Sequence, residues 1–281
     1  MNAAHTPLRR YLKNHYADGR QQLAGQHRPS PRAISNAIFA QPNPTIKHRG
    51  PSDFVWQWGQ FLDHDLDLTD GQNPPENWPI SIPKGDLHFD PRGMGTIEMS
   101  FNRSIYSNDH KGVRQQTNEI SGWIDASNVY GSDATRAQAL RTLDGTGRLK
   151  TSKGRLLPYN IDQLPNAGGD SKELFLAGDV RANEQVGLLA MHTLFVREHN
   201  RWAKILRREN PRLSGEAIYQ RARALVAAEM QIITYKEFLP ALLGKNPLPR
   251  YRGFKKHVDA RIMNEFSGAA YRLGHSMLSQ N

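Results

Sequence analysis

The sequence predicts a mainly α-helical fold with long irregular loops and little or no β-sheet. Three observations support this. Apolar residues recur at helical spacing in several segments, the longest from about residue 183 to 208. Proline and glycine are frequent in residues 70–117, which is typical of irregular structure. No series of alternating apolar and polar residues predicts a set of strands, and no internal repeat is present.

The first two predicted helices lie in the amino-terminal part of the chain. Residues 30–41 open with Ser-Pro, a combination typical of a helix start. Residues 51–66 form the second, and we expect Ser52 to cap it. Five apolar residues of this second helix form a stripe along one face: Phe54, Trp58, Phe61, Leu62 and Leu66.

Three further helices are predicted in the second half of the chain. Residues 183–208 are apolar around much of the helix circumference, so we expect this helix to be central. Ser214 is expected to cap a helix over residues 215–239, which Pro240, Gly244 and Pro247 bring to an end. The last predicted helix runs from about Val258 to Met277.

Composition and charge exclude some classes of protein. The 281 residues allow one large domain or two small ones, and no run approaches the roughly 18 apolar residues of a membrane span. The amino terminus lacks the apolar region of a secretory signal, and the absence of cysteine excludes disulfides and thiolate metal sites. The net charge of +10 is scattered and no nucleic-acid-binding motif is present, so we expect no nucleic-acid partner.

Residues 56–70, WQWGQFLDHDLDLTD, place Asp63, Asp65 and Asp67 around His64 in the second predicted helix. Buried charges are usually paired, bind a metal or take part in chemistry. Gln60 and His64 are four residues apart and share one helix face, with Asp63 beside it. Asp65 is turned by about 100° towards a different neighbour. The segment therefore offers residues to two adjacent sites, or else it is an exposed polar edge with solvated aspartates.

Two metal-binding motifs are excluded for this region. The alternating aspartates resemble the start of an EF-hand loop, but the required glycine and glutamate are replaced by Leu68 and Pro74. The segment VREHNRW contains one histidine, whereas a zincin helix needs two histidines four residues apart.

Three other segments contain candidate ligands. The loop SGWIDAS carries Ser121, Asp125 and Ser127, oxygen donors of the kind that calcium binds, although such a loop is also typical of a turn or a cap. Arg181 and Glu184 are three residues apart at a predicted helix start. They either face one pocket or form a capping salt bridge.

His275 follows Gly274, which permits close backbone approach, in the segment YRLGHSML. Its position favours either a ligand or a hydrogen-bonded core histidine.

Taken in order, these segments resemble the animal-type haem peroxidases of the peroxidase–cyclooxygenase superfamily. WGQFLDHDLDLTD is similar to the distal-helix signature of that family. The resemblance continues in RAISNAIFAQ, PKGDLHFDP, SGWIDASNVYGSD, MHTLFVREHNRWA and MQIITYKEFLP. It extends from about Tyr16 to the end of the chain. It implies the helical domain of a haem peroxidase, with residues 1–281 forming the front portion of a single catalytic domain.

The resemblance implies a role for each candidate at the haem. His64 would be the distal histidine, Arg181 the distal arginine and Gln60 the pocket glutamine near peroxide or halide. Asp63 and Glu184 match the carboxylates that form ester bonds to haem b. His275 matches the proximal ligand of the haem iron.

The resemblance also implies a calcium site and several departures from the family. The calcium ligands would be Asp65, Ser121, the Trp123 carbonyl, Asp125 and Ser127. Ser121 replaces a more usual threonine, and Gln185 replaces a methionine that makes a third haem bond in one family member, so at most two ester links are expected. The absence of cysteine suggests a microbial relative.

The chain stops six residues after His275, at Asn281, whereas the family domain continues. We therefore expect the front part of a catalytic domain, truncated after the proximal histidine, with an oligomeric state that the sequence does not indicate.

Three functions are consistent with this resemblance. The first is a peroxidase that uses hydrogen peroxide to oxidise halides, pseudohalides or small aromatic donors, with a role in the response to oxidative stress. The second is a fatty-acid dioxygenase using a tyrosyl radical, for which Tyr271 would be the nearest tyrosine before His275. The third is an inactive fragment that binds haem or calcium. The family resemblance also implies a secreted or cell-surface protein.

Overall fold

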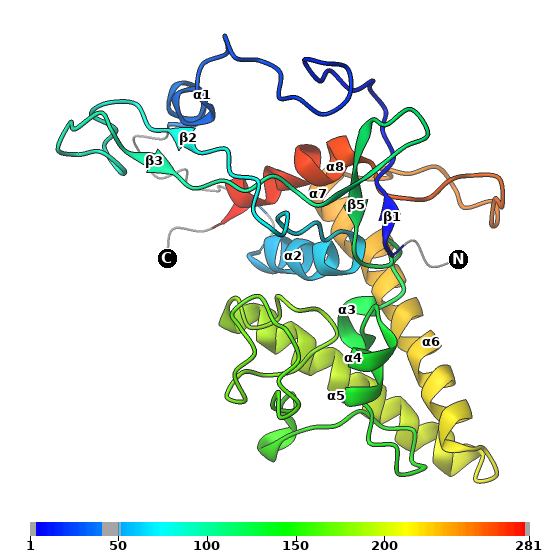
Figure 1. Cartoon of the computed structure of the whole chain (residues 1–281). Coiled ribbons are helices and arrows are strands. Elements are labelled where there is room, and N and C mark those ends of the chain that lie inside the picture. The colour runs from blue at the N-terminus through cyan, green and yellow to red at the C-terminus, as the bar shows by residue number, and fades with distance from the viewer. Residues whose placement is uncertain (1–3, 41–49, 51, 279–281) are drawn as a thin grey trace.

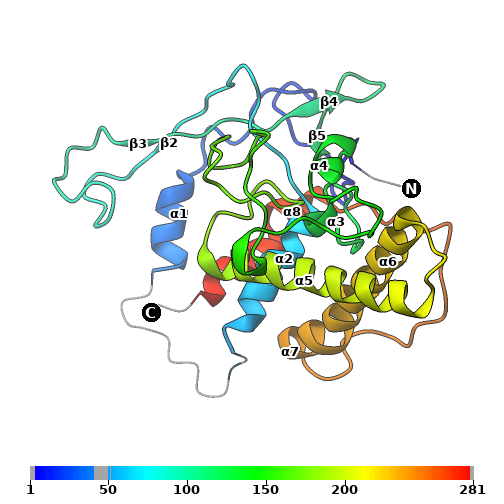
Figure 2. The same cartoon turned by 90° about the horizontal axis from the view of Figure 1, so that it is seen from below.

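The computed structural model describes residues 4–40, 50 and 52–278. Three long helices form its framework: α2 (Phe54–Leu66), α5 (Val186–Glu209) and α6 (Gly215–Ile233). Helices α5 and α6 pack against each other, and α2 packs on α5, as Figures 1 and 2 show. The predicted mainly α-helical fold is confirmed.

The remaining elements are short. The other α-helices are α1 (Pro31–Ile38), α3 (Ser127–Tyr130), α4 (Ala134–Ala139), α7 (Leu239–Leu243) and α8 (Asn264–Gly268). Two 3-10 helices, η1 (Lys153–Arg155) and η3 (Ala270–Met277), and one π-helical turn, η2 (Thr234–Phe238), complete the helical part. The strands form two small antiparallel sheets.

The three-stranded sheet has the order β1 (Thr6–Pro7), β5 (Arg114–Asn118), β4 (Tyr106–Asn108). Its register pairs Thr6 with Asn118 and Tyr106 with Gln116. A separate ribbon pairs β2 (Ile80–Ser81) with β3 (Glu98–Met99). Both lie within or beside the predicted irregular segment, and neither contributes to the central helical core.

The hydrophobic core lies where α2 crosses α5. Phe61 of α2 stacks on Phe195 of α5 with ring centroids 5.1 Å apart, and the Trp58 ring lies 5.8 Å from each of them. All three side chains are buried. Burial of such an aromatic side chain contributes roughly 2 kcal/mol, so this cluster fixes α2 firmly on α5. The polar edge of α2 is thereby held in a defined place.

The sequence located two helix starts correctly and one incorrectly. The Ser30 and Ser214 hydroxyls accept hydrogen bonds from Ala33 N and Ala217 N, as N-cap residues do. The predicted cap at Ser52 is wrong, because Asp53 is the N-cap of α2 and its side chain makes no capping hydrogen bond. Phe54, predicted on the apolar stripe, is 70% exposed because it lies in the first turn, beyond the α5 contact.

Helix α5 begins at Val186, three residues later than predicted. The Gln185 side chain caps it by accepting a hydrogen bond from Gly187 N. Residues 181–184 therefore form a turn before the helix, and this turn carries two candidate site residues.

The predicted helix from Val258 to Met277 is wrong. Residues 250–263 are irregular, and only α8 and η3 are helical. In the irregular part the backbone bonds to the amino-terminal segment instead: Arg9 N donates to Ile262 O, and Asn264 N donates to Arg9 O. Hydrogen bonds to a distant segment have replaced the local bonds of a helix.

Pro240 does not end the helical segment that follows α6. The chain passes through the π-helical turn η2 into α7, with Pro240 at the start of α7. Proline is accepted in the first turn of a helix because its missing N–H has no partner there. Gly244, with φ of 89°, provides the actual end. No helix in the described part of the chain is long and apolar enough to cross a membrane.

Candidate active site

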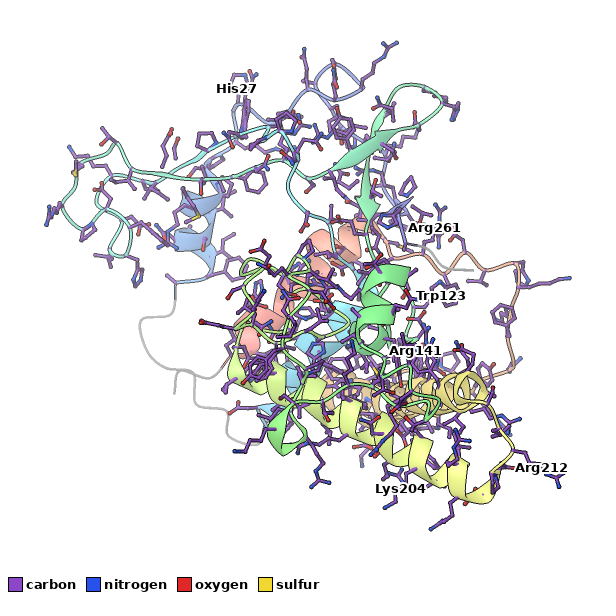
Figure 3. The ribbon with its side chains drawn as sticks, turned by 60° about the horizontal axis from the view of Figure 1, so that its bottom comes forward. His27, Trp123, Arg141, Lys204, Arg212 and Arg261 are labelled. Atoms are coloured by element: carbon purple, nitrogen blue, oxygen red, sulfur yellow. The ribbon has the colours of Figure 1, made fainter. Side chains whose placement is uncertain are left out.

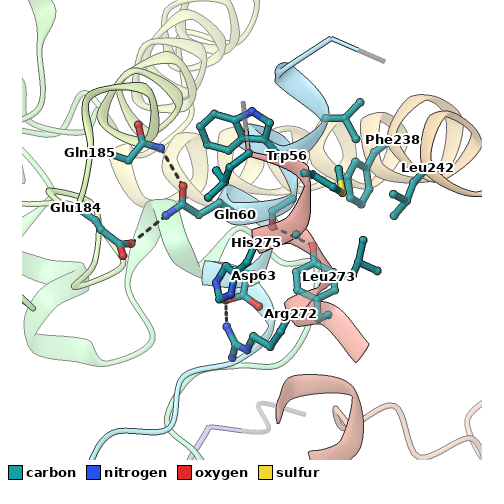
Figure 4. A pocket seen from close by; sticks show the side chains of 16 residues that line it. Trp56, Gln60, Asp63, Glu184, Gln185, Phe238, Leu242, Arg272, Leu273 and His275 are labelled. Carbon is teal, nitrogen blue, oxygen red and sulfur yellow. Dashed lines mark hydrogen bonds and ion pairs between the residues drawn. The ribbon is translucent and has the colours of Figure 1, made fainter. Parts of the chain in front are cut away.

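A cavity of about 410 Å³ lies between α2 and η3. Its polar lining, which Figure 4 shows, comes from Gln60 and Asp63 of α2, Glu184 and Gln185 before α5, and Arg272 and His275 of η3. The remaining wall is largely apolar and includes Val55, Trp56, Phe238, Leu242, Leu273, Met277 and Leu278. The cavity therefore combines a hydrophobic wall with a few polar groups, as ligand sites usually do.

A network of amide groups attaches the turn before α5 to α2. Gln60 Nε2 donates to Glu184 Oε2 at 3.0 Å, and Gln185 Nε2 donates to Gln60 Oε1 at 2.9 Å. Gln185 Nε2 also donates to Gln57 Oε1 at 2.8 Å. This network places Glu184 beside Gln60 on one side of the cavity.

His64 lies behind this lining and is buried. Its Nδ1 is 3.4 Å from Asp179 Oδ1, and its Nε2 is 4.0 Å from Glu184 Oε2. Gln60 approaches the same Glu184 oxygen, so Gln60 and His64 share one helix face as predicted. Burial and the positive charge of Arg181 lower the pKa of His64 to about 3. The imidazole is therefore neutral at pH 7.

Arg181 is held by Asp179 in a two-pronged ion pair. Its Nε donates to Asp179 Oδ1 and its Nη2 to Asp179 Oδ2, each at 2.9 Å. Burial opposes ionisation of Asp179, yet the charge of Arg181 holds the pKa of that carboxyl well below its usual range. Arg181 Nη1 lies 3.7 Å from Asp63 Oδ2. Asp179 thus orients Arg181 and faces His64 at the same time.

Asp63 is buried between two guanidinium groups, Arg181 at 3.7 Å and Arg272 at 3.5 Å. Burial and the negative charge of Asp67 raise the pKa of Asp63 to about 7, against the opposing effect of both arginines. Its Oδ1 atom has no hydrogen-bond partner within the described residues. Asp63 lines the cavity, and a buried carboxyl oxygen without a partner is a polar group whose hydrogen-bonding capacity is unfilled.

Asp65 points away from this cavity, into the loop before α3. Its Oδ1 accepts from Ser127 Oγ at 2.6 Å and from Asn128 N at 3.3 Å, and its Oδ2 accepts from Ala126 N at 2.9 Å. The predicted division of α2 between two adjacent sites is therefore present in the geometry.

The rest of the predicted oxygen-donor set lies beside Asp65. Ser121 Oγ donates to Asp125 Oδ1 at 2.8 Å and contacts Ser127 Oγ at 3.1 Å. Trp123 N donates to Ser121 Oγ at 3.4 Å. Burial and the charge of Asp125 raise the pKa of Asp65 to about 7. Two acidic side chains close to each other and to the hydroxyls of this loop are suited to a cation, although the same contacts also stabilise the turn.

Within the described parts of the chain, no group of three or more His, Asp or Glu side chains is arranged to hold a metal ion. A cation at this site would need hydroxyl and carbonyl oxygens in addition to Asp65 and Asp125.

His275 is exposed on η3 and lines the cavity, so it is not a buried core histidine. Figure 4 shows it near Asp63 and Arg272. Tyr271 Oη donates a hydrogen bond to Gly59 O at 2.9 Å, and this bond joins η3 directly to α2.

The structure thus brings Gln60, Asp63, Glu184 and His275 to one cavity. His64 and Arg181 are absent from its lining and lie behind Asp63 and Glu184.

The alternative of solvated aspartates on α2 is wrong. Asp63, Asp65 and Asp67 are 6%, 0% and 2% exposed. Asp67 Oδ2 accepts from Ser267 Oγ at 2.8 Å and from Arg272 Nη2 at 3.2 Å, so α8 and η3 cover this edge.

Sequence reasoning missed Asp179 and Arg272. Asp179 precedes Arg181 by two residues, a spacing at which a carboxylate can accept from both the backbone N–H and the guanidinium. Asp259 and Arg261 have the same arrangement elsewhere in the chain. Arg272 precedes His275 by three residues, but only the fold shows that it meets Asp63.

The model of one protein family, "animal haem peroxidase", matches residues 1–281. The chain belongs to the animal haem peroxidase family. It is 37% identical to eosinophil peroxidase from Homo sapiens, over 99% of this chain and 44% of that protein. Among solved structures, Dictyostelium discoideum peroxidase A matches with a TM-score of 0.87 and 32% identity, over 97% of this chain and 56% of that chain.

The chain spans less than half the length of the curated relatives that it matches. A fatty acid α-dioxygenase from Arabidopsis thaliana also matches, with a TM-score of 0.65 and 22% identity over 79% of this chain and 32% of that chain. At that identity the likeness extends to the fold alone.

Proposed function

We propose that this chain acts as a haem peroxidase, using hydrogen peroxide to oxidise halides, pseudohalides or small aromatic donors. The observation that carries the proposal is the arrangement around one cavity of the residues that the family resemblance assigns to haem. Asp63, Glu184 and His275 line that cavity together with Gln60. The family match over the whole chain supports the same function.

The cavity residues fit haem b by their chemistry. The apolar wall suits a porphyrin, and the unpartnered Oδ1 of Asp63 and the carboxylate of Glu184 are suited to ester bonds at its periphery. The exposed imidazole of His275 is suited to ligate the iron. When bound, haem supplies the oxidising chemistry, and the protein supplies geometry and protons.

His64 and Arg181 would carry the proton and charge chemistry. In the role that the family resemblance implies, the neutral imidazole of His64, which lies behind the cavity lining, would accept a proton from hydrogen peroxide and return it to the leaving oxygen. The guanidinium of Arg181, fixed by Asp179, stabilises the negative charge that develops as the O–O bond breaks. Gln60, held by Gln185, orients peroxide or halide through its amide.

The second site would bind calcium and stabilise α2 next to His64. The donor chemistry of Asp65, Asp125, Ser121 and Ser127 supports this, and the Trp123 carbonyl completes the proposed set. A cation between Asp65 and Asp125 would offset the raised pKa of Asp65.

The cellular role follows from the family resemblance. We propose a secreted or cell-surface location and a part in the response to oxidative stress.

The dioxygenase alternative is less well supported. It would use Tyr271, whose hydroxyl is engaged with Gly59 O. The likeness to fatty acid α-dioxygenases is one of fold. The two functions differ in their oxidant, since one consumes hydrogen peroxide and the other consumes molecular oxygen with a fatty acid.

The test is turnover by the chain reconstituted with haem b and calcium chloride. Oxidation of iodide and of a phenol is followed with hydrogen peroxide, and oxygen uptake is followed with palmitate. Removal of a general acid–base group costs typically 10²–10⁴-fold, so His64→Ala should lower the peroxidase rate by at least about 100-fold. His88→Ala, at an exposed histidine outside the cavity, is the control and should keep the rate.

Two results would overturn the proposal. One is oxygen uptake with palmitate and no peroxide turnover, which would indicate the dioxygenase. The other is haem uptake without turnover of any of these substrates, which would indicate an inactive binding fragment.

A further inference from the structure

A second cavity, of about 310 Å³, lies between α5 and the segment that contains η1. It shares no lining residue with the first cavity. Seven residues line it: Arg148, Thr151, Arg155, Arg197, Asn200, Arg201 and Lys204. Five of the seven are cationic, and this described lining contains no acidic residue.

Helix α5 supplies one wall. Arg197, Asn200, Arg201 and Lys204 follow at intervals of three, one and three residues, so all four lie on one face of the helix. Figure 3 shows Lys204 projecting outward from α5. Like charges one turn apart destabilise a helix, and a bound anion would offset this repulsion.

The opposite wall is held in place by hydrogen bonds from α5. Asn200 Oδ1 accepts from Leu149 N at 2.9 Å, and Asn200 Nδ2 donates to Leu149 O at 3.0 Å. Arg197 donates from Nε to Arg155 O at 2.9 Å and from Nη2 to Gly154 O at 3.1 Å. Arg155 adopts a φ of 59°, in the left-handed region that non-glycine residues rarely occupy. These bonds fix the backbone of the opposite wall against α5, while the five cationic side chains of the lining are exposed.

The positive charge of this cavity is poorly compensated. Arg201 pairs with Glu198 and lies 3.9 Å from Glu229. Within the described residues, the other four cations form no ion pair, and Arg197 is bonded to carbonyl groups that carry no net charge. The lining therefore carries an excess of positive charge that the described residues do not neutralise.

We propose that this cavity binds a doubly charged tetrahedral oxyanion, a phosphate or sulfate group, either free or at the end of a larger molecule. Guanidinium groups match the geometry of such oxyanions, and a lining of five cations with the hydroxyl of Thr151 favours a ligand that mainly accepts hydrogen bonds. The buried side chains of α5 that face α2 and the core, such as Phe195, lie on a different face of the helix. The oxyanion site is therefore distinct from the haem cavity.

Isothermal titration calorimetry on the full chain tests this proposal, with inorganic phosphate, inorganic sulfate and tripolyphosphate as three separate probes. The variant Arg148→Ser/Lys204→Ser removes two unpaired charges from the cavity. The control Arg252→Ser/Lys256→Ser removes two charges from an exposed irregular segment, so both variants have the same net charge. We expect the Kd to rise at least tenfold in the cavity variant and to change less than twofold in the control.

The three probes identify the source of the oxyanion. Equal affinity for inorganic phosphate or sulfate and for tripolyphosphate would indicate a free anion. Binding of tripolyphosphate alone would indicate a group carried by a larger molecule.

Two outcomes would overturn the proposal: no binding of any probe at 150 mM salt, or equal loss of affinity in both double variants. Far-UV circular dichroism checks that each variant folds. If the double cavity variant does not fold, the single change Lys204→Gln takes its place, and we expect it to raise the Kd as well.

Discussion

Replacement of Asp179 by asparagine would remove the charge that holds Arg181 while keeping the shape of the side chain. In the native protein, Asp179 accepts from Arg181 N, Nε and Nη2, each at 2.9 Å, and its Oδ1 lies 3.4 Å from His64 Nδ1. Asparagine has a single acceptor oxygen, so its amide N–H₂ would face either the guanidinium or the imidazole. One charge-assisted hydrogen bond is lost, and a buried guanidinium loses its counter-ion.

The size of the effect follows from burial. The side chains of Asp179 and Arg181 are 1% and 16% exposed. Removal of one partner of a buried ion pair costs about 3–5 kcal/mol, and the oxygen that asparagine keeps places this change at the lower end. We expect the free energy of unfolding to fall by about 3 kcal/mol.

The chain contains a matched control in Asp259 and Arg261. Arg261 donates to Asp259 from N at 3.2 Å, from Nε at 3.1 Å and from Nη2 at 2.7 Å, with the same spacing of two residues. Here the side chains are 42% and 40% exposed, so solvent screens the pair. We expect Asp259→Asn to cost less than about 1 kcal/mol.

The assay is equilibrium unfolding in urea, followed by far-UV circular dichroism, for the native chain and both variants. If the urea concentration at the unfolding midpoint falls several times further for Asp179→Asn than for Asp259→Asn, with an unchanged dependence of the free energy on urea, the buried pair contributes as expected. Equal losses for the two variants would refute the conclusion that burial makes the Asp179–Arg181 pair structurally critical.

Three further predictions concern the second site, a buried histidine and a helix cap. Calcium chloride should raise the unfolding midpoint, by an amount equivalent to about 2.7 kcal/mol when its concentration is 100 times the Kd, and Asp65→Asn should abolish this shift. An equal shift with magnesium chloride, or no shift in the native chain, would contradict the calcium assignment. Burial lowers the pKa of His199 to about 4, below its value of about 6.5 in the unfolded chain, so the stability it contributes is fully present above pH 6.5 and is lost as pH falls towards 4. Between pH 7 and pH 5, the free energy of unfolding in urea should therefore fall by about 2 kcal/mol more in the native chain than in His199→Gln. Equal losses in the two proteins would show that His199 does not titrate as described. Ser214→Ala should lower the free energy of unfolding by about 1 kcal/mol, because the capping bond to Ala217 N is lost, and Ser214→Asp should restore it; no change in Ser214→Ala would contradict the role of the cap.

Local sequence signals predicted the helices whose ends depend on nearby residues. Ser30 and Ser214 cap the helices that they were expected to cap, because an N-cap hydrogen bond reaches only three residues along the chain. Helical periodicity likewise identified α2, α5 and α6. These features need no information from distant parts of the fold.

The errors arose where distant residues compete with local bonding. Ile262 and Asn264 form backbone hydrogen bonds with Arg9, more than 200 positions earlier in the sequence, and these bonds replace those of a helix there. Phe54 carries an apolar side chain at the expected spacing, but the helix extends past its partner at that turn.

The candidate site was predicted only where the position of a side chain depends on its own helix. Spacing on α2 correctly separated Gln60 and His64 from Asp65, since the direction of a helical side chain follows from its position. The pairing of Asp63 with Arg272 brings together residues more than 200 positions apart, and only the fold shows it. The placement of His64 behind the cavity lining likewise depends on how the turn before α5 packs on α2.

The most direct measurement is an absorption spectrum of the chain titrated with haem b in the presence of calcium, before and after one equivalent of hydrogen peroxide. We expect saturation at one haem for each chain, and a Soret band that hydrogen peroxide converts to that of an oxidised form. In His275→Ala the band should shift and the affinity for haem should fall, whereas His257→Ala, at another exposed histidine, should behave as the native chain. Haem uptake that does not saturate at one equivalent, or that is the same in all three proteins, would contradict the assignment of the cavity between α2 and η3.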